Sequence, residues 1–231
     1  IPIISSNFNH RKSLEYIENY SKDVSNNSDK INNAILEQAE NYNKLVAGTD
    51  ILASFSDDRE ESEEYLGQLN VNDDGVMGYI KIPRIDVEIP IYHGTSSKTL
   101  QKGVGHLEGS SLPIGGKGTH AILSGHRGLP SSKLFTDLDQ LKENDMFYIY
   151  VLDKVLAYKV NQVKVIEPDD TSDLAIVNDK DCITLVTCTP YALNTHRLLV
   201  RGERVEYNKK VLEEIEPSKK ITISDVISSN F

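Results

Sequence analysis

The sequence predicts a mostly β fold, a barrel or a sandwich, with two amphipathic helices ahead of it. Seven short runs between residues 76 and 207 are rich in β-branched and aromatic residues and are separated by turn signals. Eight glycines fall between residues 103 and 128, where they punctuate the loops. Many short strands with few helices between them are typical of barrels and sandwiches.

Two helices are predicted in the first part of the chain. Apolar and aromatic residues recur at spacings of three and four within residues 11–20 and again within residues 30–46. Ser28 or Asp29 can cap the second helix. We therefore expect residues 1–48 to form a helical appendage packed on the surface of a β domain.

An acidic segment, residues 49–75, follows the helices. Asp and Glu cluster within residues 57–64, and the segment reads as a loop. Its composition fits a solvated linker and fits a flexible cover over a site equally well, so both interpretations stay open.

The strands are expected within residues 76–207, which we assign as the main domain. Asp153 and Lys154 form a hairpin turn in it, and the apolar spacing within residues 132–141 predicts a short helix. Residues 208–231 are expected to be a short helix and a tail. The residue pattern predicts strands over 77–82, 87–92, 120–124, 145–152, 155–166, 182–188 and 197–207.

Composition excludes several classes of protein. The 231 residues carry 35 acidic and 25 basic side chains, a net charge of −10, which argues against a nucleic-acid partner. No apolar run approaches the roughly 18–20 residues that span a bilayer, and no run resembles a secretory h-region, so we expect a trimmed soluble piece. The His and Cys spacings do not fit a metal site and there is no phosphate loop, so no cofactor and no metal are expected.

The two cysteines, Cys182 and Cys188, are expected to be free thiols. Both lie on one predicted strand, which puts their Cα atoms roughly 20 Å apart at about 3.3 Å per residue, and a disulfide needs less than about 7 Å. Cys182 reads as an ordinary buried residue. Cys188 ends the strand before Pro190, where a side chain can be exposed while its backbone is fixed.

A reactive cysteine needs a base or a cation nearby. Of the six histidines, His126 is favoured because it follows a strand and is bracketed by glycines, and His196 is the second candidate. The strand after Cys188 carries Arg197 and Arg201 on the face opposite to Leu198. Pairing of Cys188 with none of the histidines is the remaining alternative.

The motifs resemble those of sortases. Residues 184–188, Thr-Leu-Val-Thr-Cys, match the sortase TLxTC signature, and residues 124–127, Ser-Gly-His-Arg, match the histidine segment. Residues 194–202 are similar to the segment that ends in the sortase arginine strand. Further segments that look like class C, or pilus, sortases lie at 78–83, 90–94, 103–107 and 134–138, so that the resemblance covers about residues 65–207.

The resemblance implies an eight-stranded sortase-type β-barrel and a transpeptidase that cuts an LPxTG-type sorting signal between Thr and Gly. It implies that Cys188 is the nucleophile, His126 the general acid and base, and Arg197 the arginine that steadies the oxyanion or the substrate. Arg201 faces the same way and is the second choice. Thr187 and Thr189 are candidates for substrate positioning or for an oxyanion hole.

Class C sortases often carry a lid with an Asp-Pro-aromatic motif over the active site. This chain has no Asp-Pro before residue 70. Phe55 and Asp57 are the candidates that could take the places of the aromatic and acidic lid residues. A plain linker is the alternative.

The implied partners are pilin or surface-protein precursors with a C-terminal sorting signal. The acceptor is a pilin lysine or, if the enzyme instead anchors proteins to the cell wall, a peptidoglycan amine. The implied location is the outer face of a Gram-positive cell membrane, with anchoring by segments absent from this chain. A non-catalytic β domain that binds partners is the alternative from another class.

Overall fold

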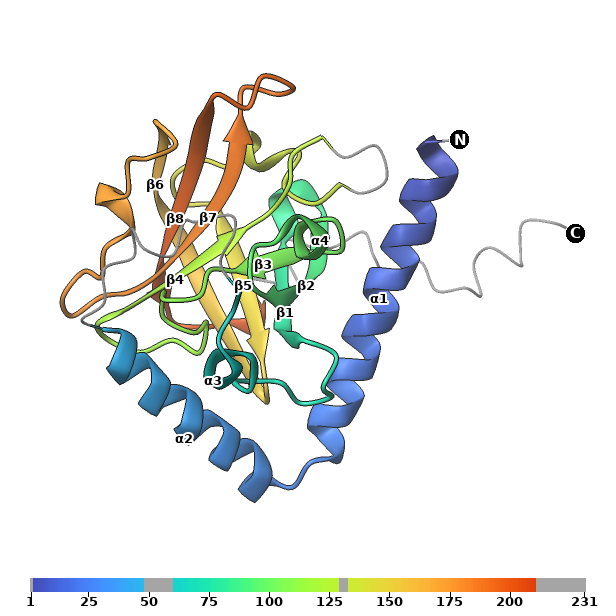
Figure 1. The fold of residues 1–231 in the computed structure, drawn as a ribbon, viewed down its shortest axis with the longest axis vertical. Coiled ribbons are helices and arrows are strands. Elements are labelled where there is room, and N and C mark those ends of the chain that lie inside the picture. The colour runs from blue at the N-terminus through green and yellow to red at the C-terminus, as the bar shows by residue number, and fades with distance from the viewer. Residues whose placement is uncertain (1, 48–59, 129–132, 211–231) are drawn as a thin grey trace, which may run out of the picture.

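Eight strands close into a barrel in the order β1-β2-β3-β4-β7-β8-β6-β5 (Figure 1). The computed structural model describes residues 2–47, 60–128 and 133–210, with only the backbone over residues 2–8. The predicted mostly β barrel is thereby confirmed. The strands are β1 (Val76–Ile82), β2 (Val87–His93), β3 (Val104–His106), β4 (Thr119–Ser124), β5 (Met146–Val151), β6 (Lys154–Ile166), β7 (Asp181–Thr189) and β8 (His196–Val205).

Helices lie outside the barrel: α1 runs along one side of it and α2 lies across one end (Figure 1). The helix predicted within residues 30–46 is α2, and α1 is longer than the predicted 11–20. The α-helices are α1 (Pro2–Asn26), α2 (Asp29–Val46), α3 (Glu63–Leu66) and α4 (Ser97–Leu100), and the short 3-10 helices are η2 (Pro83–Ile85), η3 (Leu138–Gln140) and η4 (Ser172–Leu174).

The first helix is attached to the barrel by an apolar stripe and one buried hydroxyl. Tyr20 and Val24 pack against Val76 of β1. The Tyr20 hydroxyl donates to the Met77 carbonyl at 3.1 Å and accepts from the Leu152 amide at 2.8 Å. It therefore satisfies two buried backbone groups, one in β1 and one directly after its neighbour β5.

The second helix contributes directly to the main core. Ala39, Tyr42 and Val46, at i, i+3 and i+7, are buried in the same cluster as the barrel interior. The Asn43 amide group clamps Leu112, accepting from its N–H at 2.6 Å and donating to its carbonyl at 3.3 Å. The division at residue 48 between appendage and barrel stays a prediction.

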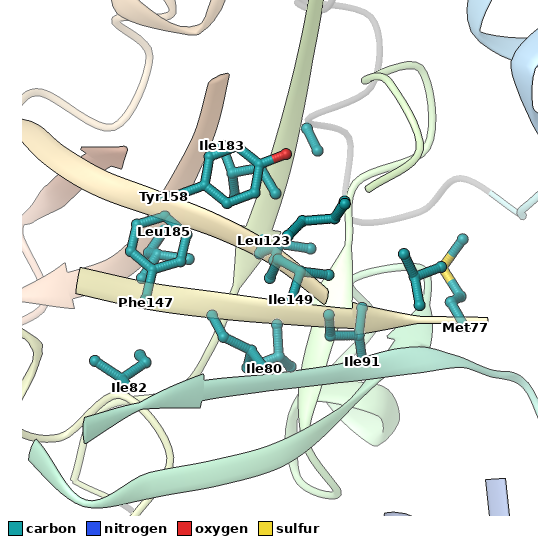
Figure 2. Packing of buried hydrophobic residues seen from close by; sticks show 14 of the residues in the cluster. Met77, Ile80, Ile82, Ile91, Leu123, Phe147, Ile149, Tyr158, Ile183 and Leu185 are labelled. Atoms are coloured by element: carbon teal, nitrogen blue, oxygen red, sulfur yellow. The ribbon is translucent and has the colours of Figure 1, made fainter. Parts of the chain in front are cut away.

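The barrel interior is filled by every second residue of the strands (Figure 2). In β7, Ile183 and Leu185 point into this core, whereas Val186 belongs to a separate cluster on the outer face with Leu199 of β8. This alternation fixes which residues of β7 and β8 face outward. The core residues labelled in Figure 2 are Met77, Ile80, Ile82, Ile91, Leu123, Phe147, Ile149, Tyr158, Ile183 and Leu185.

Two parts of the predicted secondary structure differ from the fold. The strand β3 was not expected, because it has three residues and one of them is Gly105. The helix predicted for residues 132–141 is wrong over its described part, which forms turns and the single 3-10 turn η3. Leu134 has φ +36°, outside the helical region, because the chain turns there to bury both Leu134 and Phe135 in the core.

Some sequence-based expectations lie outside the described residues. They are the lid anchors Phe55 and Asp57, most of the segment around them, and residues 211–231 of the tail.

Candidate active site

The thiol of Cys188 stands near the end of β7 on the outer face of the barrel. By strand parity it shares this face with Val186, whereas Thr187 points the other way and is 3% exposed. Cys188 itself is half-buried, and both cysteines are free, as expected. The structure thus fixes the backbone of this residue in a ladder while leaving its side chain partly accessible.

Arg197 is the direct cross-strand partner of Cys188. The antiparallel ladder of β7 and β8 pairs their Cα atoms, and parity puts both side chains on the outer face. One nitrogen of the guanidinium, Nη1, donates to the carbonyls of Asn194 at 3.3 Å and His196 at 3.1 Å. The turn before β8 therefore orients this guanidinium.

Arg201 lies further down the same face. It pairs with Thr184, four residues before Cys188, which is about 13 Å along the strand at roughly 3.3 Å per residue. Its Nε donates to Oδ1 of Asn161 at 3.1 Å. Position and bonding both favour Arg197 as the partner of the thiol.

His126 reaches the site through the parallel pairing of β4 with β7. The last pair of this ladder is Ser124 with Val186, so His126 comes two residues later, level with Cys188. The Gly125 amide continues the ladder by donating to the Val186 carbonyl at 3.0 Å. The carbonyl of His126 accepts from the Phe135 amide at 3.2 Å. The main chain on either side of the imidazole is thereby held.

Glycine is needed on both sides of His126. A Cβ on Gly125 would lie 2.6 Å from the ring of Phe135, closer than carbon atoms approach. Gly128 has φ +78°, in the left-handed region, and a Cβ there would lie 2.3 Å from the ring of Tyr191. The tight approach lets the loop after β4 pack between the core and the β7–β8 turn.

Burial lowers the pKa of His126, so the imidazole is less often protonated at neutral pH than a free one.

His196, the second candidate, pairs with Thr189 in the ladder and by parity faces away from Cys188. Its ring nitrogens contact the Thr195 hydroxyl at 2.8 Å and the Glu167 carboxylate at 3.2 Å. This arrangement favours His126 over His196.

Cys182 is at the far end of β7 and is 1% exposed. Burial raises the pKa of its thiol, which keeps it protonated and unreactive. The expectation of an ordinary buried cysteine agrees with this position.

A second buried apolar cluster lies on the outer side of the strands that carry the thiol. Its residues come from β4, β6, β7 and β8 and from the two segments that follow β3 and β6. All its members are at most 6% exposed, so the cluster is covered and supports the strands beneath Cys188 from the outer side. The members of the cluster are Leu107, Ile122, Ile166, Leu174, Val186 and Leu199.

The two threonines that flank Cys188 are both hydrogen-bonded to the loop that carries His126. The Thr187 hydroxyl donates to the Gly125 carbonyl at 2.8 Å, and Nη1 of Arg127 donates to the Thr189 hydroxyl at 3.1 Å. Sequence analysis assigns no role to Arg127. Its position next to His126 was the available signal, but its partner lies 62 residues away in the chain.

Within the described ranges, no group of three or more His, Cys, Asp or Glu side chains could hold a metal ion. In the same part of the chain, no helix combines the length and the apolar character needed to cross a bilayer.

Comparisons with known proteins point to one family. A family model of the sortase domain matches residues 80–205. The crystal structure of sortase C1 from Streptococcus agalactiae is 47% identical with a TM-score of 0.76, and the match covers 84% of this chain and all of that one (100%). Sortase C from Streptococcus pneumoniae is 44% identical with a TM-score of 0.79, over 84% of this chain and 98% of that one.

Curated relatives match over a shorter region. Sortase D of Bacillus subtilis is 30% identical over 131 residues, which are 55% of this chain and 63% of that protein. The chain therefore spans less than two thirds of the length of that relative.

Proposed function

Because this chain belongs to the sortase family, we propose that it is a cysteine transpeptidase that cuts an LPxTG-type sorting signal between Thr and Gly. The observation that carries the proposal is the convergence of three groups on one outer face. Cys188 and Arg197 are cross-strand partners, and His126 follows the strand that pairs with β7 on its other side.

Acylation would begin at the thiolate of Cys188, which adds to the carbonyl carbon of the substrate Thr. The electron pair moves to the carbonyl oxygen, where the guanidinium of Arg197 and the backbone N–H of Thr189 can donate hydrogen bonds to it. Collapse of this intermediate breaks the Thr–Gly bond and leaves a thioester. His126, as imidazolium, gives its proton to the leaving Gly nitrogen.

Deacylation would run the same groups in reverse. An acceptor amine gives its proton to neutral His126 and adds to the thioester carbonyl, and Cys188 leaves as thiolate. Because burial lowers the pKa of His126, the neutral base is well populated at neutral pH while the imidazolium needed for acylation is a minority form.

The acceptor we propose is a lysine of a pilin subunit, which gives an isopeptide bond and a polymer. The pneumococcal sortase C structure was described with regard to its pilin substrate specificity, and another similar sortase C1 comes from a pilus island. A peptidoglycan amine, the acceptor for cell-wall anchoring, is the competing outcome. Either task would be performed at the outer face of a Gram-positive cell membrane.

The proposal is tested with a fluorogenic sorting-signal peptide and with a pilin domain that carries such a signal. We expect the wild-type protein to cleave the peptide, to show an acyl-enzyme by intact mass, and to build a ladder of pilin polymers on a denaturing gel. A ladder absent with pilin, together with product formed on a cell-wall amine, would reassign the acceptor.

Cys188→Ala is the decisive variant, and Cys182→Ala is its matched control because it removes a thiol from the other end of the same strand. We expect no cleavage and no acyl-enzyme from Cys188→Ala, and both from Cys182→Ala. Equal cleavage by wild type and Cys188→Ala would show that Cys188 is not the nucleophile. Cleavage by neither would favour a non-catalytic β domain.

A further inference from the structure

The residues on both sides of Cys188 are tied to the residues on both sides of His126. Thr187 bonds to Gly125, and Arg127 bonds to Thr189, and each pair is 62 residues apart in sequence. Thr187 and Thr189 share the parity opposite to Cys188, so the two ties leave the outer face of the thiol uncovered. Together they fix the end of β7 against the loop that follows β4.

The two ties differ in kind. Thr187 is 3% exposed and reaches a main-chain carbonyl next to β4, so its bond extends a ladder that is already present. Arg127 lies past the last ladder pair, where no backbone pairing of β4 with β7 continues. Among the residues that the structure describes, its side chain is therefore the outermost hydrogen-bonded link between the two segments.

The guanidinium of Arg127 spans two acceptors. Nη1 donates to the Thr189 hydroxyl at 3.1 Å, and Nη2 forms an ion pair with the carboxylate of Asp139, at the 3-10 helix η3. The Arg127 side chain is 10% exposed and that of Asp139 is 48% exposed. The exposed carboxylate anchors one end of a largely buried cation, and the other end points at the strand that carries the thiol.

Stability alone does not account for this side chain. Its Nε is buried and, among the described residues, has no hydrogen-bond partner, an arrangement that is unfavourable for folding. The ion pair with Asp139 is half in solvent and contributes little. A buried guanidinium kept under these conditions is better explained by the geometry that it imposes.

We propose that Arg127 is a positioning residue that sets the separation of Cys188 and His126 by holding Thr189 against the loop after β4. Its hydrogen bonds go to Thr189 and Asp139, not to Cys188 or to the ring of His126. Arg127 acts on Thr189, the residue after Cys188, whose N–H can donate to the oxyanion. It also acts on its own neighbour in sequence, His126. This inference rests on the function proposed above.

Loss of a positioning contact should lower the chemical rate and leave substrate binding unchanged. Arg127→Met removes the donors but keeps an unbranched apolar stem, and Thr189→Val removes the acceptor with little change of shape. We expect each to reduce kcat about tenfold to a hundredfold, as small misplacements of reacting groups do, while KM stays within about twofold.

Two conservative variants separate positioning from charge. Thr189→Ser keeps the hydroxyl and should restore most of the kcat lost in Thr189→Val. Arg127→Lys keeps the charge but cannot span two acceptors with a planar fork, so it should stay impaired. Full activity in Arg127→Lys would mean that the charge suffices and would overturn the proposal.

A double-mutant cycle identifies the route. If Arg127 acts through Thr189, the double variant Arg127→Met, Thr189→Val should be no slower than Arg127→Met alone. Losses that multiply would show two independent roles and refute the proposal. Arg11→Met, at an exposed arginine of α1, which packs against β1 and β2, is the control and should match wild type.

Cleavage by wild type and the kcat of Arg127→Met test the proposed function and the positioning role separately. If wild type does not cleave the sorting peptide, the function is wrong and Arg127 has no reaction to support. If wild type cleaves it and Arg127→Met has an unchanged kcat, only the positioning role is wrong. The thermal unfolding midpoint of every variant is measured together with its kinetics. If kcat of a variant equals that of wild type at temperatures well below its unfolding midpoint, the role of the residue is merely structural.

Discussion

Cys188 of β7 and Arg197 of β8 are directly opposed in an antiparallel ladder, with both side chains on the outer face of the barrel. The relationship is one of backbone register, so it does not depend on the rotamer of either residue. It separates the two arginines of β8, since Arg201 stands opposite Thr184 and is bonded to Asn161. Register therefore ranks them by distance from the thiol.

Replacement of Arg197 should impair catalysis far more than replacement of Arg201. We expect Arg197→Ala to lose about 10²–10³-fold in kcat, the usual effect of removing an oxyanion donor. Arg201→Ala loses its bond to Asn161 and should mainly lower the free energy of unfolding, by about 1 kcal/mol. Steady-state kinetics and denaturant titration of both variants check this, and the reverse ranking of kcat would move the role to Arg201.

Gly125→Ala should damage fold and site together. The added Cβ would meet the ring of Phe135 at 2.6 Å, so the loop that carries His126 has to shift. We expect a loss of about 1–3 kcal/mol in stability, typical of overpacking, and a lower kcat. Gly67→Ala is the matched control, because its Cβ would meet nothing closer than 3.5 Å. Wild-type kinetics in Gly125→Ala would show that the loop tolerates the shift.

Stability should fall in mild acid because His106 is buried and neutral. Burial lowers the pKa of His106 from 6.5 to about 4. Between these values the unfolded chain holds a proton that the folded chain lacks, so the free energy of unfolding decreases as pH falls. From pH 7 to pH 5 the loss from this one group is about 2 kcal/mol.

His106→Gln should flatten that pH dependence, although its stability at pH 7 is lower because contacts with Tyr65 and Ser111 are lost. Burial lowers the pKa of His93 and His120 as well, so part of the slope remains. Urea titrations at pH 7 and pH 5 provide the comparison, with the exposed His10→Gln as control. An unchanged slope in His106→Gln would rule out His106 as a source.

Tyr20→Phe tests how firmly α1 is attached to the barrel. The variant keeps the ring but leaves the Met77 carbonyl and the Leu152 amide without their shared partner. We expect a loss of about 1–3 kcal/mol in the free energy of unfolding. Tyr16→Phe, which keeps the edge-on ring contact with Tyr92, should cost much less. Equal effects of the two changes would mean that the buried hydroxyl is not a specific tie.

Much of the fold follows from local pattern. Alternation in the strand after Cys188 predicted that Arg197 and Arg201 share the face opposite to Leu198, because a strand has only two faces. The structure adds that Leu198 faces the core and that Arg197 faces out with Cys188. The three-residue β3 has too few positions for a period to be visible. The apolar spacing within residues 132–141 predicted a helix that the described part of this segment does not form. Turns bring the same apolar side chains into the core.

Candidate residues of the site could be named where a local pattern marks them, but the contacts between distant elements could not be predicted. Cys188 and Arg197 belong to one hairpin, and His126 was identified by its place after a strand. The bond between Arg127 and Thr189 depends on β4 and β7 being neighbours, which no local pattern reveals. The relative positions of such residues are set by topology and not by propensity.

The parallel pairing of β4 with β7 also has a consequence for the order of events in folding. The two strands are separated in sequence by the whole β5–β6 hairpin, and their contacts join residues 62 apart. Closing so long a loop costs entropy before any of its contacts form, so such pairings are expected late on the folding route. Cys188 and His126 are therefore brought level with each other only when the barrel closes. If Cys188 is the proposed nucleophile, recovery of activity after dilution from denaturant should report completion of folding.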